Sequence, residues 1–194
     1  MNKVNGMNRK SLFIGNRKRK QKGAITLAEV ALGLLVSALA LAAGYAALTP
    51  ILSSYRAGKV TEELNMTIPA IQASYQSKTS FTGLSTAQVA LNGWIGSSFI
   101  ESANGKPSGG LVTQWGTLTF EAASNGTQGK GTLNNIPSNE CRKIATAFAS
   151  DQFLSATVNG TAVKTTANNL DLTAVGTQCS ATATNIITFN FSRA

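Results

Sequence analysis

Two hydrophobic patterns follow each other in the first part of the chain. The 26 residues from Val30 to Tyr55 carry no charged side chain and are mostly apolar, and about 20 such residues suffice to cross a lipid bilayer as a helix. Beyond Pro50 the apolar residues continue at steps of mostly three and four, the spacing of one helix face; they are Leu52, Tyr55, Val60, Leu64, Ile68, Ile71 and Tyr75. The pattern predicts a membrane-spanning helix followed by an amphipathic one.

The two segments form either one helix or two. Proline removes a backbone donor and glycine lowers helix propensity, so a helix has four places at which to bend or end: Gly44, Pro50, Gly58 and Pro69. Because the helical spacing continues past Pro50 instead of giving way to a loop, we expect one helix, with a hydrophobic transmembrane segment at 24–55 and an amphipathic continuation at 56–80. A spanning helix followed by a separate surface helix is the alternative.

From about Phe81 the composition shifts to Gly, Ser, Thr and Asn with shorter apolar runs, so a globular domain is expected at 81–194. A short helix is predicted at Ser85–Leu91, because a Ser cap begins it and an Asn-Gly stop follows it. A second short helix is predicted at Glu140–Phe148. Strands are predicted at Leu111–Trp115 and at Leu118–Phe120, and Ser124–Gly126 marks a turn after them. A further strand is predicted in the C-terminal stretch, where the apolar residues are Ile187, Phe189 and Phe191. We therefore expect an α+β fold in which an antiparallel sheet packs on the second half of the long helix.

The positive charge is concentrated at the N-terminus. The net charge of the chain is +9, yet eight basic residues and no acid precede residue 24, and nine basic against eight acidic groups leave the rest at +1. The folded part offers no basic face, so no nucleic acid partner is expected. Because the basic cluster lies directly before the apolar segment, the positive-inside rule keeps the N-terminus cytoplasmic and sends the rest across the membrane.

Several kinds of chemistry are excluded by composition. The chain has no His, which removes the usual general base and the commonest metal ligand. The only adjacent acids are Glu62 and Glu63, and neighbouring residues point to different sides of a helix, so no two-carboxylate site can be assembled. We expect no catalytic residue, no cofactor and no metal, and hence no enzyme.

The two cysteines, Cys141 and Cys179, are 38 residues apart on the part of the chain that is expected to be exported. An even cysteine count in an oxidising compartment predicts a disulfide. Two free thiols or a metal site are the alternatives, although two cysteines without His supply few ligands.

The string from Lys22 to Val30, KGAITLAEV, resembles the processing site of type IV prepilins, in which a basic leader ends in Gly before an apolar helix that begins with a Thr-Leu-x-Glu-like string. The long leader, the Ala- and Gly-rich helix and the two distant cysteines resemble the type IVb branch, in particular its PilS-like pilins. The resemblance implies that prepilin peptidase removes a leader at 1–23 by cutting between Gly23 and Ala24. Members usually carry the acid five residues after the cut, and a cut between Ala24 and Ile25 would restore that spacing for Glu29.

Glu29 is the one charged residue at the beginning of the apolar segment. A carboxylate in hydrocarbon costs several kcal/mol unless it is paired or protonated. Glu29 therefore either is hydrated at the depth of the lipid headgroups or has a partner. The resemblance implies that it pairs with the new amino terminus and sets the register of neighbouring subunits in a filament.

The resemblance implies a structural function: the major pilin of a type IVb pilus, made as an inner-membrane precursor and polymerised into an extracellular filament for adhesion or conjugative contact. The implied partners are other copies of the chain, prepilin peptidase, the assembly platform and its ATPase, the membrane, and a host or recipient cell surface. A minor pilin or a type II secretion pseudopilin is the alternative, and a membrane-anchored extracytoplasmic enzyme is a further one.

Overall fold

The structure is a computed structural model that describes residues 27–166 and 169–193. The chain divides into two units, 1–43 and 44–194. The predicted processing residues Gly23, Ala24 and Ile25 lie outside the described residues.

The long helix α1 runs from Leu27 to Tyr75 and contains both Pro50 and Pro69. The prediction of one continuous helix is confirmed. Around the first proline, the hydroxyls of Ser53 and Ser54 donate to the Pro50 carbonyl at 3.3 and 2.9 Å. These contacts give the helix local side-chain hydrogen bonds at the turn where proline removes a backbone donor.

The buried face of α1 differs from the prediction at its beginning. Leu52 and Tyr55 are 48% and 60% exposed, whereas Ser53 and Ala57 are 4% and 2% exposed and begin the buried face. The later members are buried as expected: Val60, Leu64, Ile68, Ile71 and Tyr75. The prediction was wrong for two residues because it followed hydrophobicity, whereas the small side chains are the ones that let the globular domain approach the helix.

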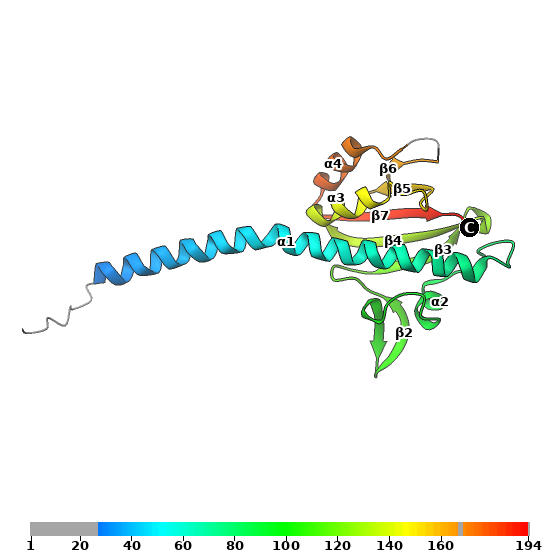
Figure 1. Ribbon diagram of the computed structural model, residues 1–194, viewed down its shortest axis with the longest axis horizontal. Helices are drawn as coiled ribbons and strands as arrows, with labels where there is room; N and C mark the ends of the chain where they lie inside the picture. The colour runs from blue at the N-terminus through cyan, green and yellow to red at the C-terminus, as the bar shows by residue number, and fades with distance from the viewer. Residues whose placement is uncertain (1–26, 167–168, 194) are drawn as a thin grey trace, which may run out of the picture. The chain divides into compact units, whose positions relative to one another are not determined.

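A five-stranded sheet forms the centre of the second unit (Figure 1). Its order is β3 (Leu118–Ala123), β4 (Gln128–Pro137), β7 (Thr184–Phe191), β5 (Ser155–Val158) and β6 (Thr161–Lys164), and every neighbouring pair is antiparallel. A separate hairpin joins β1 (Ile100–Ala103) to β2 (Lys106–Leu111). The α+β fold with an antiparallel sheet is confirmed, as are the strand at Leu118–Phe120 and the C-terminal strand.

Within the residues that the structure describes, three short α-helices accompany the sheet: α2 (Thr86–Leu91), α3 (Ser138–Ala147) and α4 (Leu172–Ala181). The first two and the turn at Ser124–Gly126, which is the 3-10 helix η2, were predicted; a second 3-10 helix, η1, is Ser97–Phe99. Ser85 caps α2 by accepting from the Gln88 amide at 3.3 Å. Asp171 caps α4 by accepting from the amides of Thr173 and Ala174 at 2.8 and 3.0 Å.

The predicted strand at Leu111–Trp115 is wrong beyond its first residue. Strand β2 ends at Leu111, and Thr113 closes a turn instead: its backbone amide donates to the Gly116 carbonyl at 2.7 Å, and the Gly116 amide donates to its hydroxyl at 3.2 Å. A threonine hydroxyl that bonds nearby backbone competes with the strand ladder, which residue propensity does not show.

The second unit has one hydrophobic core, to which the buried residues of α1 and the inner face of the sheet both belong. Aromatic rings fill its centre. The ring centroids of Phe148 and Phe153 lie 4.6 Å apart, and those of Phe148 and Phe189 lie 5.0 Å apart in a stacked arrangement. This core fixes the second half of α1 against the domain, as predicted.

Candidate assembly surface

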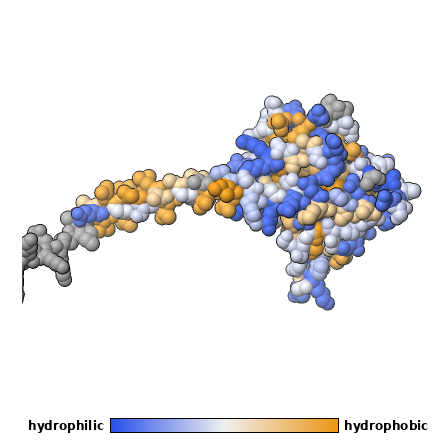
Figure 2. Space-filling model, in the orientation of Figure 1, coloured by the Kyte–Doolittle hydropathy of each residue, from blue (hydrophilic) through white to orange (hydrophobic). Residues whose placement is uncertain are grey.

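The first half of α1 carries an unusually apolar surface. Large hydrophobic residues are exposed on it from Leu27, which is 90% exposed, to Leu41, which is 76% exposed. The helix is long and apolar enough to cross a membrane, and none of its apolar stretch is buried within the chain. In Figure 2 this part of the helix is largely orange, whereas the globular domain is mostly blue and white. An exposed apolar surface of this kind requires a lipid or protein partner.

The composition of this surface suits both partners. Leucine and valine alternate with small residues such as Ala31, Gly33 and Ala38, and small residues let helices approach closely in a membrane or a bundle. A Cβ added at Gly33 would meet nothing within 4 Å, so this position is open to a neighbouring helix. The surface can therefore move from lipid to other helices of its own kind without losing apolar contact.

Glu29 lies in the first turn of α1 and is exposed. A carboxylate is favoured there because the unsatisfied amides of a helix N-terminus carry partial positive charge. The position agrees with the predicted acid at the beginning of the apolar segment. Its role in subunit register stays a prediction.

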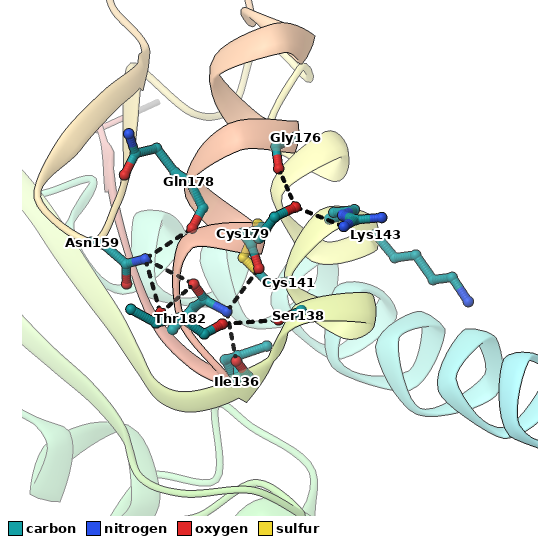
Figure 3. Close-up of a disulfide and its surroundings, with 12 residues drawn as sticks. Ile136, Ser138, Cys141, Lys143, Asn159, Gly176, Gln178, Cys179 and Thr182 are labelled. Atoms are coloured by element: carbon teal, nitrogen blue, oxygen red, sulfur yellow. Dashed lines mark hydrogen bonds between the residues drawn. A yellow bond between two sulfur atoms is a disulfide. The ribbon is translucent and has the colours of Figure 1, made fainter.

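The predicted disulfide is present and joins two helices. Cys141 of α3 and Cys179 of α4 are bonded, with their Cα atoms 5.7 Å apart, and both are fully buried. Figure 3 shows the bond between the two helices. The alternatives of free thiols and of a metal site are wrong, and residues 27–166 and 169–193 hold no cluster of three or more His, Cys, Asp or Glu side chains.

A buried asparagine organises the surroundings of the disulfide. Asn185, 1% exposed, donates through its side-chain amide to the carbonyls of Ile136 and Cys179 at 3.2 and 3.3 Å. Its side-chain oxygen accepts from Asn159 at 2.7 Å and from Thr182 at 3.1 Å. In Figure 3, dashed hydrogen bonds reach the labelled Asn159 and Ile136 close to the disulfide. The network links β4, α4, β7 and the β5–β6 turn.

A lysine fixes α3 to the middle of α1. The ammonium of Lys143 donates to the hydroxyls of Ser53 and Ser54 at 2.7 and 2.6 Å and to the Pro50 carbonyl at 3.3 Å. These bonds join α3 to the turn of α1 that follows Pro50, where Ser53 begins the buried face. Sequence reasoning missed Lys143, Asn159 and Asn185. The only signal was the Asn159-Gly160 pair, which is typical of a tight hairpin turn.

Comparison with known proteins found a family model and solved structures that are similar to this chain. The chain matches the family model for Bundlin over residues 53–190. It is similar to the solved structure of a type IV b pilin from Salmonella typhi, with 18% identity and a TM-score of 0.49 over 68% of this chain and 98% of that one. It is also similar to TcpA, a type IV pilin from Vibrio cholerae El Tor biotype, with 16% identity and a TM-score of 0.48 over 71% of this chain and 99% of that one. No curated protein matches the sequence.

Proposed function

The chain belongs to the Bundlin family of type IVb pilins, and from this premise we propose that it is the major subunit of a filament that polymerises through α1. Members of the family are structural subunits, so the protein is a pilin and not an enzyme. The observation that carries the proposal is the exposed apolar surface from Leu27 to Leu41. In a filament, that surface is covered by the corresponding helices of other copies.

The precursor is held in the inner membrane by the same helix. The uncharged segment Val30–Tyr55 is long enough to span the bilayer, and the basic leader keeps its N-terminus on the cytoplasmic side. Prepilin peptidase then cuts after Gly23, and the assembly platform with its ATPase draws the trimmed subunit into an extracellular filament. The filament serves adhesion or conjugative contact with a host or recipient cell.

N-terminal sequencing of sheared surface fibres tests the processing step. The expected first residue is Ala24, and Ile25 would place the cut at the alternative bond. Cells without the peptidase should keep the full chain in the membrane and make no fibres. Fibres built from chains that still begin with Met1 would contradict the proposal, and electron microscopy with quantification of the trimmed chain in the fibres separates a major from a minor subunit.

The register role of Glu29 is tested by Glu29→Gln. The neutral amide keeps the size of the side chain but cannot neutralise a buried amine in a neighbouring copy. The variant should insert into the membrane and be trimmed, but should form few or no fibres. Glu62→Gln, which changes an exposed acid in the second half of α1, is the matched control and should form normal fibres. Normal fibres from the Glu29 variant would contradict the register role.

A further inference from the structure

Glu140 is a buried carboxylate without a partner in the described part of the chain. It lies in the first turn of α3 and is 6% exposed, and no hydrogen bond or ion pair of its carboxylate occurs within residues 27–166 and 169–193. The N-terminus of α3 favours a negative charge there. The carboxylate oxygens of Glu140 are not among the fully enclosed atoms that lack a partner, so they are open to the adjoining pocket. A ligand that fills the pocket replaces the water there and therefore has to supply a cation to the carboxylate.

Glu140 lines a pocket in the second unit, between α1 and the beginning of α3. Tyr45, Leu48 and Leu52 form its apolar wall, and Arg56 lines it as well. These residues are exposed, and Arg56 does not come within ion-pair distance of Glu140. The two basic residues of α3 are engaged elsewhere: Arg142 donates to the hydroxyl of Ser180, and Lys143 donates to those of Ser53 and Ser54. The pocket thus offers an acid and a guanidinium, both available, beside an apolar wall.

The pocket lies where the membrane-held chain leaves the hydrocarbon. About 20 residues of helix cross the bilayer, so a span that begins at Val30 ends close to Thr49. Arg56 is the first charged residue after the span. While the precursor is held in the bilayer, as the proposed function requires, this part of α1 lies at the depth of the outer-leaflet headgroups.

We propose that the pocket binds the headgroup of a zwitterionic phospholipid that carries a primary ammonium, as phosphatidylethanolamine does. The ammonium donates to the Glu140 carboxylate. The phosphate accepts from the Arg56 guanidinium, whose planar fork suits phosphate oxygens. The acyl chains follow the apolar wall at Leu48 and Leu52 toward the hydrocarbon. One molecule thus neutralises both charges and covers the apolar residues between them.

The helix of a second copy suits this pocket less well. The described part of α1 before Arg56 holds no basic residue, so a neighbouring apolar helix laid over the pocket would exclude water from Glu140 without supplying a cation. Such burial of a lone charge is costly. A choline headgroup carries the charge but has no N–H to donate, which leaves the carboxylate oxygens without hydrogen bonds.

Lipid retention by the full-length precursor tests the proposal. The protein is placed in nanodiscs of equal parts phosphatidylethanolamine, phosphatidylcholine and phosphatidylglycerol with identical acyl chains, then released into mild detergent and weighed by native mass spectrometry. Retained phosphatidylethanolamine should exceed phosphatidylcholine by about tenfold, the effect of one charge-assisted hydrogen bond. Glu140→Gln and Arg56→Gln should each abolish the preference. Glu62→Gln and Lys59→Gln, which change residues outside the pocket, should keep it.

Three results would overturn the headgroup site. They are equal retention of the two lipids by the wild type, an undiminished preference in Glu140→Gln, and loss of fibres in Glu140→Gln with an unchanged lipid profile, which would assign the pocket to a second copy. An intact disulfide and an unchanged melting temperature establish that each variant is folded. Fibre formation by the wild type is scored separately. Normal fibres from a protein that shows no preference for phosphatidylethanolamine refute the lipid site alone. A clear preference for phosphatidylethanolamine in a protein that forms no fibres refutes the proposed function alone.

Discussion

Gly131 of β4 and Phe189 of β7 face each other across the sheet, and a Cβ atom at Gly131 would lie 2.2 Å from Cζ of the phenylalanine ring. The same relationship repeats two pairs further along, where a Cβ at Gly129 would lie 2.3 Å from Cζ of Phe191. The two glycines therefore make room for two aromatic rings on the inner face of the sheet. Packing of this kind specifies the core more tightly than burial of apolar residues alone.

Gly131→Ala should destabilise the folded protein by about 1 to 3 kcal/mol, because overpacking displaces neighbours that cannot easily move. Phe189 is held by its stacking on Phe148. Urea unfolding followed by tryptophan fluorescence measures the effect. Gly176→Ala is the matched control: nothing lies within 4 Å of its added Cβ on α4, so that variant should be neutral or more stable by up to about 1 kcal/mol. Equal stability of both variants would contradict the packing argument.

Replacing Cys141 and Cys179 together by Ala should lower the free energy of unfolding by about 4 kcal/mol, the chain-entropy estimate for a loop of this length. Thermal unfolding of the oxidised wild type and the double variant measures the difference. Thiol labelling of the exported chain under denaturing conditions should find no free sulfhydryl before reduction. Labelling without reductant would show that the bond does not form in the cell.

Asn185→Ala should destabilise the domain by about 2 to 3 kcal/mol, since it removes the side-chain donor to the carbonyls of Ile136 and Cys179 in a buried place. Hydrogen exchange should rise at the beginning of β7 and in the β5–β6 turn. Asn134→Ala is the matched control, because its side chain bonds Thr117 on an exposed part of the sheet and its loss should cost less than about 1 kcal/mol. A larger effect at Asn134 than at Asn185 would refute the role of the network.

Burial raises the pKa of Tyr75 above its ordinary value of 10.0, and its phenol donates to Gln88 at 2.8 Å. The folded state therefore favours the neutral form. The resulting stability is complete below about pH 10, the unfolded-state value, and is lost as pH rises through the folded-state pKa. Tyr75→Phe should be less stable by about 1 kcal/mol at neutral pH through the lost hydrogen bond, but should lose less stability on titration above about pH 10.

Unfolding of both proteins in urea at a series of alkaline pH values checks this prediction. Tyr55→Phe, which changes an exposed ring, is the control for removal of a phenol. Parallel pH profiles of the wild type and Tyr75→Phe would contradict the linkage.

The sequence contained strong local signals for part of this architecture. The uncharged run from Val30 and the helical spacing of Val60, Leu64 and Ile68 determine α1. The alternation at Ile187, Phe189 and Phe191 determines β7. In each case the periodicity of the buried side chains matches the geometry of one element, so neighbours along the chain suffice to predict it. The number and expected compartment of the cysteines likewise predicted the disulfide.

The rest depended on contacts between residues far apart in the chain. The glycines Gly129 and Gly131 do not indicate a strand in the sequence. In the fold they lie in β4, where the rings of Phe191 and Phe189 from β7 occupy the space that a side chain would fill. Ser53 is buried and Leu52 is exposed, and the Ser53 hydroxyl accepts a hydrogen bond from Lys143 of α3. Glu140 is an ordinary acid in the sequence and a buried one only in the fold. The sequence by itself determined the elements whose pattern is local, whereas the tertiary structure decided where small and polar residues are buried, because their partners come from other elements.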